Sequence, residues 1–401
     1  MSFTEMRKLL SLENLTLIAI VLGFIAGVFI PEKVKELKLL GDVFLSLLKM
    51  IIVPLVFTSV FVAMIGLGSL RKFGDMGIKT LAYYTATTGL SVGVGLILVN
   101  LIDPGEGAGV DLTAGGEVRV KSLTLEDIVW NIIPSNPVKS FTEGKVLQII
   151  FFAVLLGLAT LTVRREKLDH IRDLFEGLNE GLINLTRWVV KLTPLGVFAL
   201  VSYMVATAGV GVFLSLWEYA LTVILGLLIH AFLVLPAIAF ILGRYNPYSY
   251  LRKVREAPLL AFSTASSAAT LPVSMQVAEE KGKVRKETAG FVLPLGATVN
   301  MDGTALYESV AAVFIANLYG IDLSLPQMVM IFLTATLASI GAAAIPGAGL
   351  VMLALVLSSV GVPLEGIGII IAVDRFLDML RTAVNVWGDL NGAKIIDRFV
   401  R

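Results

Sequence analysis

The residues best suited to chemistry lie near the end of the chain, in the stretch DRFLDMLRTAVNVWGD (374–389), which follows the almost wholly apolar GVPLEGIGIIIAV. At about 100° per residue, a helix gathers five of its polar side chains into one stripe less than about 90° wide: Asp374, Asp378, Arg381, Asn385 and Asp389. Arg375 falls outside the stripe. If this helix crosses a membrane, each charge facing lipid would cost roughly 2.5–3.5 kcal/mol. The stripe must therefore face a cavity, another polar group or a ligand.

The stripe has the groups that an acidic amino acid requires. Arg381 offers a planar fork to a carboxylate, and Asp378, one turn earlier, can accept from an ammonium group. Asn385 can serve both a ligand and an ion. The alternative is an internal ladder in which Asp378 pairs with Arg381, but it leaves Asn385 and Asp389 unexplained. The sequence assigns no ligand to Asp374 or Arg375.

A second polar group interrupts an apolar segment at NMDGT, residues 300–304. Its carboxylate, amide and freed carbonyl oxygens suit a small hard cation, and Gly303 lets the backbone open. The alternative is a kink in which Asp302 satisfies itself. The stretch YYTATT adds hydroxyls at one-turn spacing, which alone are a weak signal because threonine often bonds its own helix: Tyr84, Thr87 and Thr88.

The composition of the whole chain indicates an integral membrane protein. Of 401 residues, 56% are hydrophobic and 16% charged, and mean hydropathy is +0.86, whereas soluble domains carry about 25% charged residues. A net charge of +1 predicts no nucleic-acid partner. The chain has no cysteine, which excludes disulfides, and its two histidines, His170 and His230, are far apart and expected to be structural.

Apolar runs long enough to cross a bilayer as helices occupy residues 15–30, 41–69, 76–102, 145–163, 174–206 and 214–243. The first is expected to be a retained helix, because no small-residue cleavage site follows it. Later segments are broken: 246–279 contains ASSAATLP, 286–319 contains NMDGT, 325–358 contains ASIGAAAIP, and 363–399 holds the polar stripe. Paired interrupted segments of this kind indicate the binding site of a secondary transporter.

Lys and Arg concentrate near residues 1–14, 70–79, 164–172, 244–255, 281–286 and 394–401. The positive-inside rule then places both termini in the cytoplasm. This orientation requires 246–279 and 325–358 to enter and leave on one side, as re-entrant hairpins whose tips meet near the midplane. The Gly-rich segment 103–145 is expected to be an external loop.

The stretches NMDGTALYE, ASIGAAAIPGAG and DRFLDMLRTAVNVWGD, with LLKMIIVPLVF and TPLGVFAL, closely resemble the glutamate transporter family of sodium-coupled dicarboxylate and amino-acid symporters. The likeness covers essentially the whole chain. It implies an all-α integral membrane protein of the elevator type, with eight transmembrane helices, two re-entrant helical hairpins and inverted repeats. It also implies a homotrimer in the cell (inner) membrane.

The resemblance also implies a division of the chain into a static scaffold and a moving transport domain. Residues 1–75 would hold scaffold helices 1 and 2, and 76–102 transport-domain helix 3. Residues 103–206 would hold the external loop and scaffold helices 4 and 5. The rest of the transport domain would occupy 214–401, as helix 6, hairpin 1, helix 7, hairpin 2 and helix 8.

Carried over by position, the resemblance implies roles for individual residues. Arg381 would bind the substrate's side-chain carboxylate and Asp378 its amino group. Further substrate contacts would come from Thr304, Thr382, Asn385, Ser266, Ser267 and the backbone from Ile345 to Gly349. Three sodium ions would be held, the first by Asp389, Gly296, Asn300 and Asn385, the second by Thr298, Ser339, Ile340 and Ala342, and the third by Asp302, Asn300, Tyr84, Thr87 and Thr88.

Three features depart from the pattern of the family. Archaeal aspartate transporters have an arginine where Ala265 stands and animal ones where Met379 stands, so that accessory cation is missing here. Archaeal members have Gln at Glu308, whereas animal glutamate transporters have Glu and use it to carry a proton. Two interpretations of Glu308 stay open, a proton carrier and a hydrogen-bonded structural residue. The hairpin tip AIPGAG lies between the archaeal and animal patterns.

These features predict a secondary active symporter, not an enzyme, that takes up L-aspartate or L-glutamate with Na⁺. Coupling to H⁺ as well is a second hypothesis. The alternatives are a C4-dicarboxylate symporter, which does not require the substrate's amino group, and an anion channel of the same fold, which would carry current without accumulating substrate. A membrane-embedded hydrolase would need a Ser-His or metal-His set, which the sequence does not suggest.

Overall fold

The computed structural model describes residues 12–66, 74–106, 129–130, 132–208, 211–341 and 348–400, and all regular elements among them are helices. Many large apolar side chains point outward from these helices: Phe29, Leu101, Trp217 and Phe240 are each about 70% exposed or more. Apolar exposure on this scale is typical of a surface covered by lipid. The expectation of an all-helical membrane protein is therefore confirmed.

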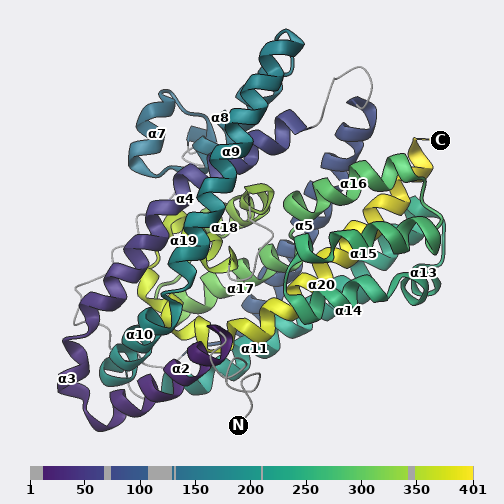
Figure 1. Ribbon diagram of the computed structural model, residues 1–401. Helices are drawn as coiled ribbons and strands as arrows, with labels where there is room; N and C mark the ends of the chain where they lie inside the picture. Colours follow the sequence, from purple (N-terminus) through teal and green to yellow (C-terminus); the bar gives the residue numbers. More distant parts are fainter. Residues whose placement is uncertain are drawn as a thin grey trace, which may run out of the picture.

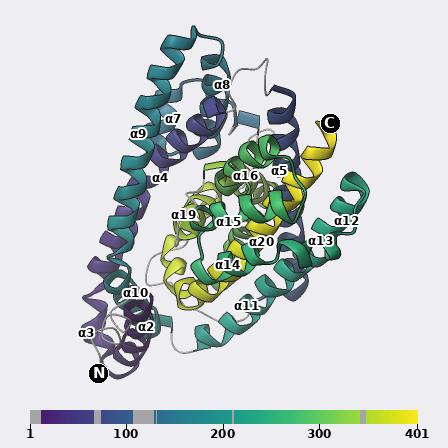
Figure 2. The same ribbon diagram turned by 45° about the vertical axis from the view of Figure 1, so that its right-hand side comes forward.

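A first bundle, defined here as α2–α4 and α7–α10, collects the early helices. The N-terminal α2 (Leu12–Phe29) packs on α10 (Thr193–Ala208), and the long α4 (Lys38–Gly66) contacts α8, α9 and α10. Figure 2 shows α4 and α9 running side by side along one flank of the molecule. The remaining helices of this bundle are α3 (Pro31–Lys35), α7 (Pro137–Glu143), α8 (Val146–Thr160) and α9 (Arg165–Val190).

The predicted span over 174–206 is not one straight helix, because the chain forms two helices there, which together are long and apolar enough for one bent span. Helix α9 ends at Val190, α10 begins at Thr193, and the two are bent by 51°. Pro194 lies in the first turn of α10, where its missing N–H costs nothing, but it cannot continue a helix from before. Three other stretches are by themselves long and apolar enough to cross a membrane: Pro31–Gly66, Asp75–Ile102 and Ser215–Gly243.

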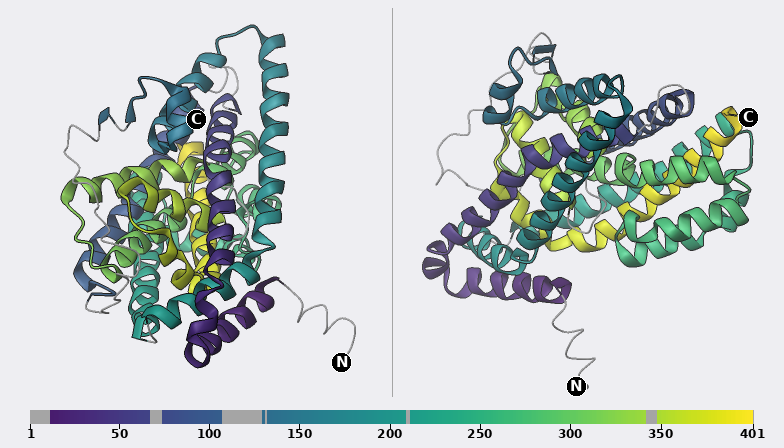
Figure 3. Two further views of the ribbon diagram at one scale, coloured as in Figure 1. Left: turned by 90° about the vertical axis from the view of Figure 1, so that its left-hand side faces the viewer. Right: turned by 45° about the horizontal axis from the view of Figure 1, so that its top comes forward.

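A second bundle, defined here as α5 and α11–α20 with the short turns between them, surrounds the last helix. Helix α20 (Ile367–Phe399), entered through the 3-10 turn η5 (Leu364–Gly366), contacts α11, α14, α16 and α17. Figure 1 and the right-hand view of Figure 3 show α20, in yellow, running between green helices. Helix α5 (Gly74–Ile102) precedes α8 in the chain, yet it packs on α17, α11 and α18 of this bundle. The other long helices here are α11 (Gly211–Ile229), α16 (Lys286–Val299) and α17 (Asp302–Leu318).

Two pairs of short helices within the second bundle match the predicted broken segments. Helices α14 (Glu256–Thr264) and α15 (Ser267–Glu280) lie against each other and against α20. The turn between them uses Ala265 at φ 48°, and the Ser266 hydroxyl accepts from the Ala269 N–H. The second pair comprises α18 (Leu325–Ala338), continued by the 3-10 turn η4 (Ser339–Gly341), and α19 (Ala348–Val360). Its tip residues 342–347, with Ala342 and Ile345, lie outside the described residues.

The helix that begins as α11 changes its winding before it ends. It passes through π-helical η2 (His230–Val234), a turn of α-helix α12 (Leu235–Ile238) and π-helical η3 (Ala239–Gly243), and α13 (Pro247–Val254) follows. Pro236 has no N–H to give to the carbonyl of Phe232 four residues earlier. The Tyr248 hydroxyl donates to that carbonyl instead, at 2.7 Å. Other side chains therefore satisfy the backbone that the proline frees.

Candidate functional site: a buried polar core between α5, α17 and α20

The site begins at a break in the chain between α16 and α17. Helix α16 ends at Val299 and α17 begins at Asp302, so Asn300 and Met301 connect them in a non-helical conformation. Asn300 and Asp302 are completely buried. The predicted interruption at NMDGT is confirmed. In a membrane such a break must be enclosed by protein or line a cavity, because unsatisfied backbone groups are too costly in lipid.

Hydroxyl groups of α5 converge on Asp302. Thr88 donates to Asp302 Oδ1 at 2.7 Å, and the Thr87 hydroxyl lies 3.3 Å from both Asp302 Oδ1 and Asn300 Oδ1. Ser91 donates to the Asp302 carbonyl at 2.8 Å. Tyr84 is also buried here, with its hydroxyl donating to the Val292 carbonyl at 2.9 Å. Neutral and anionic oxygens a few ångströms apart form the kind of ligand set that a hard cation takes.

A second group of oxygens surrounds Asp389 on α20. The Asn300 amide donates to Asp389 Oδ1 at 2.9 Å, and Asn385 Oδ1 accepts from the Gly303 N–H at 2.7 Å. Gly296 packs against the same carboxylate: a Cβ added there would lie 2.5 Å from Asp389 Oδ1. The four residues to which the resemblance assigns one sodium ion are therefore neighbours: Gly296, Asn300, Asn385 and Asp389.

Arg381 is the largest fully buried charged side chain among the described residues. Its Nη1 donates to Asp374 at 3.0 Å and its Nη2 to Asp378 at 2.8 Å, while its guanidinium stacks 3.7 Å from the centre of the Tyr307 ring. Its Nε, although buried, has no hydrogen-bond partner within the described part of the chain. Two carboxylates around one guanidinium give the cluster a net negative charge, which an incoming ammonium group can balance.

The hairpin helices approach this arginine and the stripe beside it. A Cβ added to Gly349 at the start of α19 would lie 3.2 Å from Arg381 Nη2. The tip of the first hairpin is polar yet buried, with Ser266 8% and Ser267 4% exposed. Thr382 donates to the Asp378 carbonyl at 2.7 Å, and the Thr304 hydroxyl accepts from the Asn385 amide at 3.3 Å.

The residues expected to form the second sodium site are less completely described. Ser339 and Ile340 are buried in the turn η4, which contacts α16. Thr298, near the end of α16, is exposed. Ala342 lies outside the described residues, as does Ile345 of the expected substrate set. The structure thus places only part of this predicted group.

Glu308, two turns into α17, is completely buried, and neither of its carboxyl oxygens has a hydrogen-bond partner among the described residues. An ionised carboxylate without a partner in an apolar interior is strongly disfavoured relative to the neutral acid. The interpretation of Glu308 as a hydrogen-bonded structural residue has no support in these contacts.

Sequence reasoning missed three members of the core. Asp374 pairs with Arg381, although no ligand was assigned to it, and its place seven residues earlier on the same stripe was the available signal. Tyr307 lies under the guanidinium, and His230 contacts Asp302 at 2.9 Å. The contact between Arg381 and Asp378 shows that the predicted internal ladder also exists.

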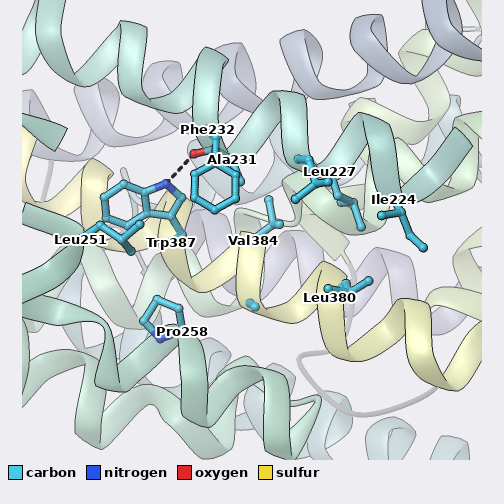
Figure 4. Close-up of a pocket in the computed structure, with 11 residues that line it drawn as sticks. Ile224, Leu227, Ala231, Phe232, Leu251, Pro258, Leu380, Val384 and Trp387 are labelled. Carbon is cyan, nitrogen blue, oxygen red and sulfur yellow. Dashed lines mark hydrogen bonds between the residues drawn. The ribbon is translucent and has the colours of Figure 1, made fainter. Parts of the chain in front are cut away.

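The opposite face of α20 has a different character. Leu380, Val384 and Trp387 line a cavity of about 190 Å³ against α11, and its wall is almost entirely carbon (Figure 4). The Trp387 indole donates to the Ala231 carbonyl at 3.0 Å. One helix thus separates a polar core from an apolar cavity.

Comparisons with known proteins agree with this architecture. The model of the Sodium:dicarboxylate symporter family matches residues 12–399. The chain is 35% identical over 393 residues to the proton/sodium-glutamate symport protein of Geobacillus stearothermophilus, covering 95% of this chain and 93% of that protein. It is also 35% identical to the proton/glutamate-aspartate symporter of Escherichia coli (strain K12), over 96% and 91% of the two chains. Excitatory amino acid transporter 1 of Ambystoma tigrinum is 35% identical, over 96% and 82%. The chain therefore belongs to the sodium:dicarboxylate symporter family, and it is a membrane transporter, not an enzyme.

Proposed function

We propose that this protein takes up L-aspartate or L-glutamate by symport with Na⁺. The observation that carries the proposal is Arg381, an arginine buried beside two carboxylates, whose Nε donor has no partner among the described residues. A buried charge of this kind is a functional site by default in a membrane protein. Two relatives are named as symporters of glutamate, or of glutamate and aspartate, with protons or sodium, and their names support the same substrate class.

The substrate would replace part of the internal pairing of Arg381. Its side-chain carboxylate would accept from the guanidinium, and its ammonium group would pair with Asp378. Asn385, Thr382 and Thr304 would add hydrogen bonds. The α-carboxylate would meet the hairpin tips, through Ser266, Ser267 and the backbone from Ile345 to Gly349.

Sodium ions would take the oxygen clusters beside this pocket, as substrates that travel with the amino acid. One would bind Asp389 with Gly296, Asn300 and Asn385, and another would bind Asp302 with Asn300, Tyr84, Thr87 and Thr88. The short oxygen-to-oxygen distances around Asp302 support the latter site. A further ion would use Thr298, Ser339, Ile340 and Ala342.

A proton would travel on Glu308. Its burial with no hydrogen-bond partner in the part of the chain that the structure describes favours the neutral acid, and opening the site to water would allow it to ionise. This role does not require Glu308 to touch the substrate.

The transport cycle would move the second bundle against the first, with the first bundle as the trimer-forming scaffold. The packing of α5 with α17 and α11, away from its neighbours in the chain, supports this division. In this proposal the protein has eight transmembrane helices and two re-entrant hairpins, and both of its termini lie in the cytoplasm.

Competition with unlabelled ligands in proteoliposomes tests the substrate class. Under an inward Na⁺ gradient, excess L-aspartate should suppress uptake of labelled L-glutamate, whereas succinate should compete at least about tenfold more weakly because it lacks the ammonium group that Asp378 recognises. If succinate competes as well as aspartate, the protein is a C4-dicarboxylate carrier instead.

A further inference from the structure

His230 is a completely buried histidine in the π-helical segment η2, and the mechanism above gives it no role. Its Nε2 lies 2.9 Å from Asp302 Oδ2. Its Nδ1 is also buried and has no hydrogen-bond partner among the described residues. With a hydrogen on Nε2, the ring donates to the carboxylate.

The carboxylate of Asp302 has different partners on its two oxygens. Oδ1 receives the Thr88 hydroxyl at 2.7 Å and lies 3.3 Å from Thr87, whereas Oδ2 faces His230. Because each oxygen is held from its own side, rotation of the carboxylate would break contacts at both ends. The arrangement fixes Oδ1 toward α5, where the proposed sodium ligands gather.

We propose that His230 is a positioning residue for the sodium site at Asp302, holding one carboxylate oxygen so that the other is presented to the ion. The inference rests on the proposed function. Removing a group that hydrogen-bonds and orients a metal ligand typically lowers metal affinity about 10–100-fold. His230 faces Asp302 from the π-helical segment η2, and the next carbonyl, of Ala231, accepts from the Trp387 indole.

The test compares His230→Leu, which removes the donor, with His230→Gln, whose amide N–H can replace Nε2. Thr222→Val is the matched control, because Thr222 is buried on the same helix and bonds only its own backbone, at the Glu218 carbonyl. Two quantities are measured on purified protein: the Na⁺ concentration for half-maximal aspartate binding, and the aspartate affinity at saturating Na⁺.

His230→Leu should raise the half-saturating Na⁺ concentration about tenfold and leave aspartate affinity at saturating Na⁺ nearly unchanged. His230→Gln should recover most of the loss, and Thr222→Val should behave as the unmodified protein. Equal Na⁺ dependence in the unmodified protein and a folded His230→Leu would overturn the role, as would a His230→Gln no better than His230→Leu. If His230→Leu does not fold, His230→Phe, which keeps a flat ring but has no N–H donor, replaces it with the same expected rise in half-saturating Na⁺. Aspartate binding that is independent of Na⁺ in the unmodified protein would instead refute the proposed function.

A separate observation concerns the apolar cavity behind α20. Leu228 and Phe232 line the cavity and are each almost half exposed. Leu251 and Pro258 lie on another side of it (Figure 4). Leu233 and Leu259, which adjoin lining residues in the chain, are each 62% exposed, so the cavity lies within the apolar outer face. In a membrane protein such a face meets lipid chains.

Three cationic residues lie in the chain between Leu251 and Pro258, two residues that line the cavity. Arg255 comes four residues after Leu251 of α13 and three before Pro258 of α14, and it is the single residue that connects these two helices. Arg252 and Lys253 stand beside it. All three cations are exposed, and the described residues give none of them an ion pair.

We infer that the cavity and these cations form a binding site for an anionic phospholipid, with an acyl chain in the cavity and the phosphate at Arg255. Positive charge beside an apolar opening between membrane helices complements this ligand. The all-carbon lining offers no hydrogen bonds to a peptide, which argues for a chain of methylenes.

Native mass spectrometry of the purified protein with added phosphatidylglycerol or phosphatidylcholine tests the site. Three variants are compared: Ala383→Phe, which fills the cavity, Arg255→Gln, and the control Arg165→Gln at the exposed start of α9. Phosphatidylglycerol should bind more tightly than phosphatidylcholine. Ala383→Phe should weaken phosphatidylglycerol binding at least about fivefold, and Arg255→Gln should remove the preference between the lipids, each without effect from Arg165→Gln.

Equal binding of the two lipids, or unchanged binding in Ala383→Phe, would overturn the assignment. If Ala383→Phe does not fold, Leu251→Trp replaces it as the cavity-filling variant. Because the chain has no native cysteine, Leu228→Cys offers a further check. An intermolecular disulfide at that position in liposomes would show that a second copy, not lipid, covers the opening.

Discussion

The two bundles of this protein bury very different groups. In the described part of the first bundle, the buried polar residues are all neutral, such as Thr58, Gln148 and Thr186. The second bundle buries every described Asp, Glu, Arg and His that is hidden from solvent: His230, Asp302, Glu308, Asp374, Asp378, Arg381, Asp389 and Asp397. Burying a charge is costly unless it is paired or used. The difference indicates that the second bundle contains the binding machinery and the first supports it.

The largest effect should come from Arg381→Cys. Removing one partner of a buried, hydrogen-bonded charge cluster costs about 2–5 kcal/mol, so aspartate affinity should fall about 100-fold or more. Neutral amino acids should gain binding, because the remaining pocket no longer requires a carboxylate. Calorimetry with aspartate and with serine measures both changes.

Arg398→Cys is the control for this variant, because Arg398 lies near the end of the same helix, is only half-buried and donates to the Leu242 carbonyl. It should keep aspartate affinity within about twofold, since a partly exposed charge remote from the pocket contributes little. Unchanged aspartate affinity in Arg381→Cys would refute the proposal that Arg381, and with it the second bundle, binds the substrate.

Asp302→Asn should have the next largest effect, on sodium alone. The amide keeps the size of the side chain but loses the charge that attracts the cation, so half-saturating Na⁺ should rise about 10–100-fold. A titration of aspartate binding against Na⁺ checks this. Asp322→Asn, at an exposed position just after α17, should leave the titration unchanged; a shift of equal size there would mean that the effect is not specific to the site.

Glu308→Gln should abolish the coupling of uptake to protons and preserve uptake driven by Na⁺. Because the neutral amide mimics the protonated acid, uptake driven by Na⁺ should persist within a few-fold, while stimulation by an inward proton gradient should disappear. Uptake at fixed Na⁺ with and without a pH gradient makes the measurement, with Glu176→Gln in the first bundle as the control. A proton response that survives in Glu308→Gln would leave sodium as the only ion assigned to the described site.

The smallest functional effect should come from the first bundle. Asn179 on α9 accepts from Thr58 at 3.1 Å and from Ser59 at 2.8 Å on α4. Asn179→Leu should lower stability by about 1 kcal/mol for the lost hydrogen bonds, seen as a lower melting temperature in detergent. Aspartate and Na⁺ affinities should not move, and a change in either would contradict the separation of the two bundles.

Helix geometry made part of the site predictable. The spacing of Asp378, Arg381, Asn385 and Asp389 placed them on one face because an α-helix has a fixed turn. The break at NMDGT was also readable, because its polar residues and glycine interrupt an apolar run. Both features are local, and the structure confirms them.

Features that depend on distant partners were not predictable in this way. His230 reaches Asp302 across 72 residues of sequence, through a π-helical segment that apolar periodicity does not reveal. Asp374 and Arg381 are only seven residues apart, but their pairing depends on the direction in which the Arg381 side chain points, which the spacing does not determine. The bend between α9 and α10 was signalled locally by Pro194, but the length of the apolar run masked it.

The most direct test of the central claim is aspartate accumulation in proteoliposomes under independently imposed Na⁺, H⁺ and K⁺ gradients. An inward Na⁺ gradient alone should drive aspartate above its external concentration. Collapsing that gradient should abolish accumulation, and Arg381→Cys should not accumulate aspartate under any gradient. Equilibration of aspartate without accumulation, accompanied by a steady anion current, would refute Na⁺-coupled symport and identify the protein as a channel.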